Sequence, residues 1–314
     1  MPTFNYRGLM VPVFTPFNND RNRSLNLSKV PEYAEFLSSK NIKGILVNGT
    51  TGEGPSLTTI ERKQVAEAWL AAVGKTKQHL MVQVGGTNLT EVRELAAHAE
   101  KIGVDSLLCL PDLYFKPTSA EDLIDYLQLV GLSAPNTPLL YYHIPSFSKV
   151  EINMGEFLES IGDKVPTFAG IKFTSNNLEE GYRAIKSNNS FAVFLGNDTL
   201  VAAACAIGMD SFTLTSLNFI PEPAISILEY GKGKKDLNSA KLDQELIIKV
   251  VEEVTRYGNW VNTMKIAMSL TTNLFMGPPR APLKLLPRED VEAMAAGLSG
   301  FGLKTNQTAL MQLY

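Results

Sequence analysis

The stretch FAGIKFTSNN contains one lysine, Lys172, in the middle of a short apolar run. A lysine in such a strand is costly to bury unless it is paired, although its stem can pack while the ammonium reaches water. Strand alternation would place Lys172 on one face with Gly170 and Thr174. Ile171 and Phe173 would then point the other way. Burial disfavours the charged form of an amine, and a neutral amine can attack a ketone to form a Schiff base.

The turn NGTTGEG, residues 48–54, follows another apolar run and carries two adjacent hydroxyl side chains, Thr50 and Thr51. One interpretation is a glycine-rich turn that leads into a helix. The other is a cradle for a carboxylate, built from the two hydroxyls and the backbone N–H groups at a helix start. The residues alone favour neither interpretation over the other.

The run YYHIP offers an aromatic hydroxyl close to a strand end. Tyr141 and Tyr142 are adjacent, so only one of them can face the same way as Lys172. His143 is most simply a structural histidine. The three histidines are scattered without ligand spacing, and neither G-x-G-x-x-G nor a Walker loop occurs, so we expect no metal and no nucleotide cofactor.

The composition of the 314-residue chain is that of a soluble globular protein, with 45% hydrophobic residues and a net charge of −3. This charge argues against a nucleic-acid partner. No apolar run approaches the length of a membrane span, and the N-terminus does not resemble a signal peptide, so we expect a cytoplasmic protein. Cys109 and Cys205 lie in apolar runs and are interpreted as core residues.

A short β-rich run followed by a helix-like segment recurs eight times, which predicts a (β/α)₈ TIM barrel. A doubly wound open sheet is the alternative, but the first run ends in FTPFNND, without a glycine-rich phosphate turn. We expect residues 1–218 to hold the barrel strands and their helices, and residues 219–314 to add the last barrel helix and a C-terminal helical extension of the same fold unit. The expected strands are 8–14, 42–48, 79–85, 106–111, 139–145, 168–174, 191–197 and 211–216.

Taken together, GILVNGTTGEGPSLTTIERKQVAEAW, YYHIP and GIKFT resemble the pyruvate-dependent class I aldolases, which include N-acetylneuraminate lyase and dihydrodipicolinate synthase. VNGTTGEG, YYHIP and MGPPRAPL are most similar to the animal-type lyases, and the resemblance runs from about residue 7 to 300. It implies a carbon–carbon lyase that cleaves N-acetylneuraminate to pyruvate and N-acetylmannosamine, without a cofactor, as a homotetramer. Another 2-keto-3-deoxy sugar acid as substrate, or a non-catalytic keto-acid sensor, are the alternatives.

The resemblance also implies roles for individual residues. Lys172 matches the Schiff-base lysine, Tyr142 the tyrosine that transfers a proton, and Thr50 a member of the proton relay. Substrate-binding positions are matched by Thr51, Thr174, Gly196, Asp198, Thr199 and Thr215. The lyases usually have a glutamate that binds the glycerol tail of sialic acid at the position of Thr199.

Overall fold

Eight parallel strands close into a barrel in chain order in the computed structural model, which describes residues 2–306 and 308–313. Each expected strand is confirmed, with ends trimmed by up to three residues. The TIM barrel prediction is therefore correct, and the open sheet is excluded. The strands are β1 Leu9–Pro12, β2 Gly44–Val47, β3 His79–Gln83, β4 Ser106–Cys109, β5 Leu139–His143, β6 Phe168–Phe173, β7 Ala192–Leu195 and β8 Ser211–Thr213.

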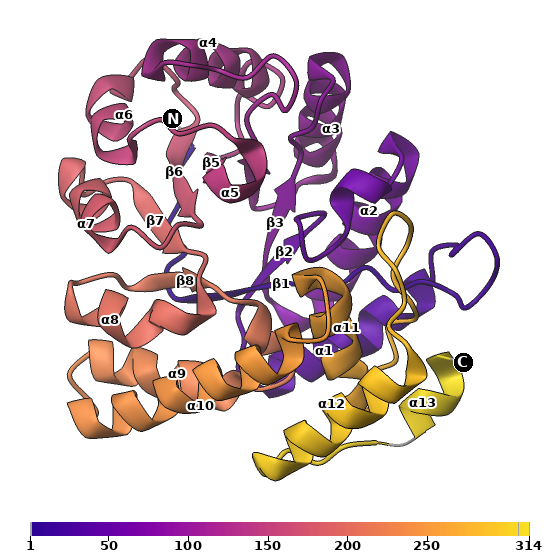
Figure 1. Cartoon of the computed structure of the whole chain (residues 1–314). Coiled ribbons are helices and arrows are strands. Elements are labelled where there is room, and N and C mark those ends of the chain that lie inside the picture. Colours follow the sequence, from indigo (N-terminus) through magenta and orange to yellow (C-terminus); the bar gives the residue numbers. More distant parts are fainter. Residues whose placement is uncertain (1, 307, 314) are drawn as a thin grey trace.

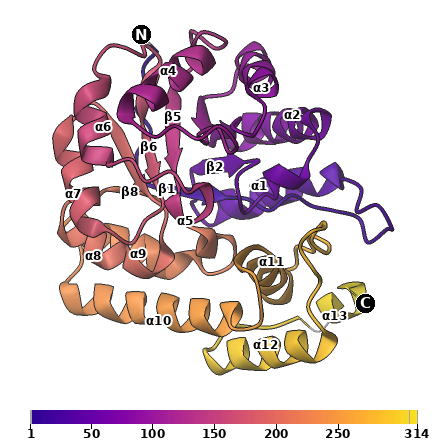
Figure 2. The same ribbon diagram turned by 45° about the horizontal axis from the view of Figure 1, so that its top comes forward.

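Helices connect successive strands and surround the barrel (Figure 1). They are α1 Val30–Ser39, α2 Thr59–Thr76, α3 Leu89–Ile102, α4 Ala120–Gly131, α5 Pro145–Ser148, α6 Met154–Ile161, α7 Leu178–Ser187, α8 Val201–Ala206 and α9 Pro221–Gly231. A further layer covers one side of the barrel (Figure 2) and consists of α10 Leu237–Thr255, α11 Trp260–Thr271, α12 Arg288–Gly300 and α13 Thr308–Leu313. The C-terminal helical extension is thus present.

Two hydrophobic layers hold the barrel, one inside it and one between strands and helices. The inner layer contains Tyr142, whereas the neighbouring Tyr141 packs in the outer layer. Ile171 and Phe173 are also in the outer layer, as alternation predicts for the strand of Lys172. The inner layer consists of Met10, Leu46, Met81, Leu108, Leu110, Leu140, Tyr142, Ile144, Ala169, Ala192 and Phe194.

A register shift interrupts β6 before Lys172. Leu139 pairs with Phe168, but Leu140 pairs with Gly170, so the skipped Ala169 packs in the inner layer. Gly170 has φ 146°, and a Cβ there would lie 2.0 Å from the carbonyl oxygen of Ala192. Only glycine fits this close approach. Beyond the shift the register is regular.

Both cysteines belong to the hydrophobic core of the barrel. Cys109 and Cys205 are free and buried, as expected of core residues. Burial raises the pKa of the Cys109 thiol to about 12 and that of Cys205 to about 11, so both thiols stay protonated near neutral pH. Within residues 2–306 and 308–313, no helix is long and apolar enough to cross a membrane.

Candidate active site

A pocket of about 260 Å³ opens at the carboxyl ends of the strands, the end that carries the active sites of TIM barrels. All nine site residues predicted from the sequence line it: Thr50, Thr51, Tyr142, Lys172, Thr174, Gly196, Asp198, Thr199 and Thr215. They come from the ends of β2, β5, β6, β7 and β8. The structure therefore brings the predicted residues together in one pocket, and the geometry indicates what each side chain can do.

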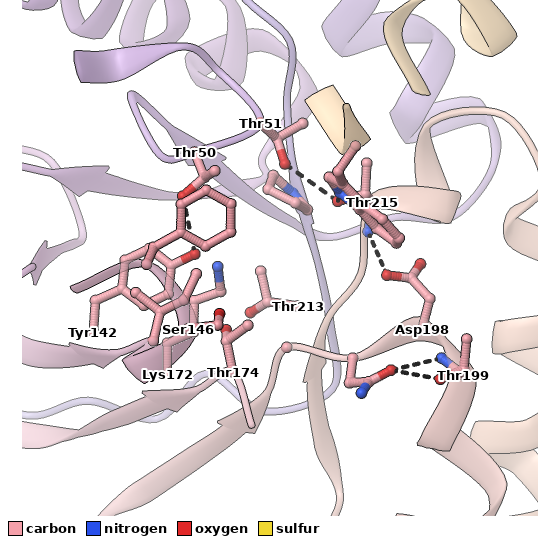
Figure 3. A pocket seen from close by; sticks show the side chains of 16 residues that line it. Thr50, Thr51, Tyr142, Ser146, Lys172, Thr174, Asp198, Thr199, Thr213 and Thr215 are labelled. Atoms are coloured by element: carbon pink, nitrogen blue, oxygen red, sulfur yellow. Dashed lines mark hydrogen bonds between the residues drawn. The ribbon is translucent and has the colours of Figure 1, made fainter. Parts of the chain in front are cut away.

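Lys172 and Tyr142 are direct neighbours across the β5–β6 ladder. The Lys172 side chain points into the pocket and is only 6% exposed (Figure 3). Its Nζ lies 3.8 Å from the centroid of the Tyr142 ring. The Tyr142 hydroxyl is 3.3 Å from Thr50 Oγ1, so the amine of Lys172, the phenol of Tyr142 and the hydroxyl of Thr50 lie in series. Groups arranged in this way can attack a carbonyl and move a proton.

Local contacts fix the backbone conformation of the turn that carries Thr50 and Thr51. The N–H of Glu53 donates to the carbonyl of Thr50 at 3.1 Å. Gly54 must be glycine, since a Cβ would lie 2.0 Å from the carbonyl oxygen of Asn48. The helix-leading turn of the first interpretation is present, and the two threonine side chains face the pocket as the cradle interpretation requires.

The hydroxyls of Thr51 and Thr215 are hydrogen-bonded to each other in the pocket wall, with 3.2 Å between their Oγ1 atoms (Figure 3). The indole N–H of Trp260 donates to the same Thr215 Oγ1 at 3.3 Å. Trp260 begins α11, so the C-terminal layer contributes to the pocket wall.

Asp198 lies in the pocket wall, but its carboxylate is occupied by backbone groups. It accepts hydrogen bonds from the N–H of Thr215 at 3.3 Å and of Ser216 at 2.8 Å. Complete burial raises the pKa of Asp198, and these two hydrogen bonds oppose the rise. Asp198 therefore fixes the chain after β8, where Thr215 enters the pocket.

Thr199 and Asn197 form an uncharged rim of the pocket. The Oδ1 of Asn197 accepts from both the N–H and the hydroxyl of Thr199 at 2.9 Å (Figure 3). The amide nitrogen of Asn197 donates to Asn176 Oδ1 at 2.7 Å. A ligand at this rim would meet neutral hydrogen-bonding groups.

Sequence reasoning missed several lining residues. Asn197, next to Gly196 at a strand end, could have been found by the same strand-end rule. Ser146 and Phe147 lie on α5 just after β5, so the same rule could have found them as well, whereas Trp260 belongs to a distant helix to which no strand-end rule points. Pro12, Ile144 and Thr213 complete the lining.

No group of three or more histidine, cysteine, aspartate or glutamate side chains in the described residues is placed to hold a metal ion.

Residues 5–299 match the model of the dihydrodipicolinate synthetase family. The chain belongs to this family. Its relatives include the N-acetylneuraminate lyases of chicken (Gallus gallus), 36% identical over 90% of this chain and 92% of the relative, and of mouse (Mus musculus), 35% identical over 92% and 90%.

The structure of this chain is similar to that of the N-acetylneuraminate lyase (sialic acid aldolase) of Aliivibrio salmonicida. That lyase is 29% identical and has a TM-score of 0.89, covering 96% of this chain and 98% of its own. The lyase of Proteus mirabilis has a TM-score of 0.88 at 28% identity, covering 95% and 99%. The resemblance inferred from the sequence is thereby confirmed.

Proposed function

We propose that this chain is a class I aldolase, a carbon–carbon lyase that cleaves N-acetylneuraminate into pyruvate and N-acetylmannosamine. The observation that carries the proposal is the row of three neighbouring side chains in the pocket, Lys172, Tyr142 and Thr50. The lyase relatives, similar over nine-tenths of the chain, support the choice of substrate.

In the proposed reaction, the amine of Lys172 attacks C2 of the open-chain keto acid, and water leaves as the imine forms. The protonated imine accepts the electron pair of the C3–C4 bond when that bond breaks. Tyr142, through the substrate carboxylate and Thr50, removes the proton of the C4 hydroxyl, so that N-acetylmannosamine leaves as an aldehyde. The enamine is then protonated at C3, and water releases pyruvate and regenerates Lys172.

The remaining residues bind the substrate in this proposal. Thr51 and the backbone of its turn hold the carboxylate, with Thr215 hydrogen-bonded to Thr51. Thr174, Gly196, Asp198 and Thr199 surround the sugar tail. No cofactor takes part in any step.

A different sugar acid is the second candidate, because Thr199 and Asn197 are neutral where a tail-binding carboxylate is usual in the lyases. A keto-acid sensor is less well supported, because binding alone does not require a lysine, a phenol and a hydroxyl in series.

We further propose a cytoplasmic homotetramer. The side chains of Tyr114 and Phe115, 75% and 82% exposed, are of the kind that a subunit interface buries.

Pyruvate release from a panel of 2-keto-3-deoxy acids tests the proposal. We expect release from N-acetylneuraminate with equimolar N-acetylmannosamine. Release only from acids with shorter tails would favour the second candidate, and no release from any acid would refute the aldolase. Light scattering after size-exclusion chromatography gives the mass of the oligomer.

A further inference from the structure

Helix α11 carries a lysine, Lys265, whose side chain is 0% exposed. All residues from 261 to 270 are buried, and the helix contacts α10, α12, α13 and the turn Thr215–Asn218. Lysine is rarely buried without a partner. Lys265 does not line the pocket and takes no part in the proposed reaction.

The ammonium of Lys265 is held by two groups. It donates to Glu53 Oε1 at 2.8 Å and to the carbonyl of Thr15 at 2.9 Å, and it lies 4.2 Å from the ring centroid of Phe17. Burial lowers the pKa of Lys265, and the facing Glu53 carboxylate opposes this effect. Such a buried pair adds little net stability compared with apolar side chains, so it is better understood through the geometry that it fixes.

Both partners of Lys265 hold the turn that carries Thr50 and Thr51. Glu53 belongs to that turn, has φ 54°, and accepts a further hydrogen bond from the N–H of Arg280 at 2.8 Å. The hydroxyl of Thr15 donates to the carbonyl of Gly52 at 2.6 Å. The turn is therefore anchored at both Gly52 and Glu53, directly after the two threonines.

We propose that Lys265 is a positioning residue, which through Glu53 and Thr15 holds the turn of Thr50 and Thr51 in the conformation that binds the carboxylate of the keto acid. This inference rests on the proposed function, because it assigns the carboxylate to that turn. It makes a selective prediction: loss of Lys265 weakens the capture of carbonyl compounds that bear a carboxylate, and spares those that do not.

The test is reductive trapping on Lys172. Pyruvate and acetaldehyde each lose water to form an imine with the lysine, and cyanoborohydride supplies the hydride that reduces it to a secondary amine, which peptide mass mapping quantifies. For Lys265→Met we expect the half-saturating pyruvate concentration to rise about 10- to 150-fold, the range for losing a hydrogen bond to a charged group. That of acetaldehyde should stay within about twofold of the wild-type value.

Two further variants separate positioning from general damage. The double variant Glu53→Gln/Lys265→Met leaves no buried charge unpaired, so it can be measured even if Lys265→Met does not fold. It should show the same rise in the half-saturating pyruvate concentration. Met264→Ala is the matched control, since it removes a buried apolar side chain from the same helix and should destabilise the fold without changing the pyruvate-to-acetaldehyde ratio.

An unchanged ratio in both lysine variants overturns the inference, and so does an equal change of the ratio in Met264→Ala. Wild-type protein that pyruvate fails to label at Lys172 overturns the proposed function itself. The two failures are therefore distinguishable.

Discussion

Lys172 and Tyr142 are register partners on neighbouring strands, with the ammonium nitrogen 3.8 Å from the ring centroid. Backbone hydrogen bonds of the barrel set the spacing of adjacent strands at about 4.8 Å. The separation of the Lys172 amine and the Tyr142 ring is thus set by two hydrogen-bonded strands of the barrel, rather than by a loop.

Borohydride treatment with pyruvate should label Lys172 alone. The other lysine buried near the site, Lys265, is ion-paired and lies outside the pocket. The added mass should map to the peptide containing Lys172 and vanish in Lys172→Ala. Labelling at another lysine would contradict the mechanism.

Tyr142→Phe should slow cleavage and leave imine formation intact. The change removes the hydroxyl that lies 3.3 Å from Thr50 Oγ1 and keeps the ring beside Lys172. A general acid–base group contributes about 10²- to 10⁴-fold, so kcat should fall by that factor. Pyruvate trapping at Lys172 serves as the control, and an unchanged kcat would remove Tyr142 from the relay.

Gly196→Ala should impair substrate capture, because the new Cβ would lie 2.2 Å from Thr174 Oγ1 and 3.3 Å from Lys172 Cε. The methyl group would displace the hydroxyl of Thr174 and crowd the nucleophile. We expect kcat/KM to drop at least about tenfold, and the double variant Gly196→Ala/Thr174→Ala to recover part of it. Equal kcat/KM values for wild type and Gly196→Ala would show that the close packing of Gly196 against Thr174 and Lys172 is not required.

Thr199→Glu should lower KM for N-acetylneuraminate. Thr199 offers one neutral hydroxyl, already donating to Asn197, whereas a carboxylate could accept from two tail hydroxyls. A hydrogen bond to a charged acceptor is worth roughly 1.5–3 kcal/mol, or about 10- to 150-fold. Pyruvate trapping should not change. If KM is unaffected, Thr199 does not contact the tail.

Stability should fall on acidification below pH 6.5 because His143 is buried as a neutral ring. It stacks on Phe173 with 5.4 Å between centroids, its Nε2 is 4.0 Å from Glu180 Oε1, and desolvation lowers its pKa to about 4. The unfolded chain, with the ordinary value near 6.5, binds more protons in this window, so stability rises with pH.

From pH 6.5 to 5, His143 alone should account for a loss of about 1.5 kcal/mol in the free energy of unfolding. Urea denaturation at the two pH values measures it, and His143→Gln should show a smaller loss than wild type. His79, whose pKa burial also lowers to about 4, provides a residual dependence in that variant. The same pH dependence in His143→Gln and wild type would contradict the assignment.

Strand ends were the predictable part of the site, because alternation and apolar runs reveal both where a parallel strand stops and which side chains face inward. Lys172 and the two threonines of the turn follow from that rule, whereas the choice of Tyr142 over Tyr141 came from the family resemblance. Ala169 does not follow from the rule, because a register shift in β6 suspends the alternation locally. The helical residues Trp260 and Lys265 also escaped prediction. Helical periodicity shows that a helix is buried, but it does not show which elements cover it. The partner of Lys265, Glu53, lies 212 positions away in the sequence.

The rim made by Asn197 and Thr199 follows β7, whereas the amine and the phenol stand on β6 and β5. The residues proposed to break the bond therefore precede, on other strands, the position where the lyases usually carry the glutamate that binds the tail. A substitution of Asn197 or Thr199 can therefore change the groups that the rim offers to a ligand without altering the strands that carry Lys172 and Tyr142. Enzyme engineers can use the same separation by varying Asn197 and Thr199 while keeping Asp198, which holds the segment after β8.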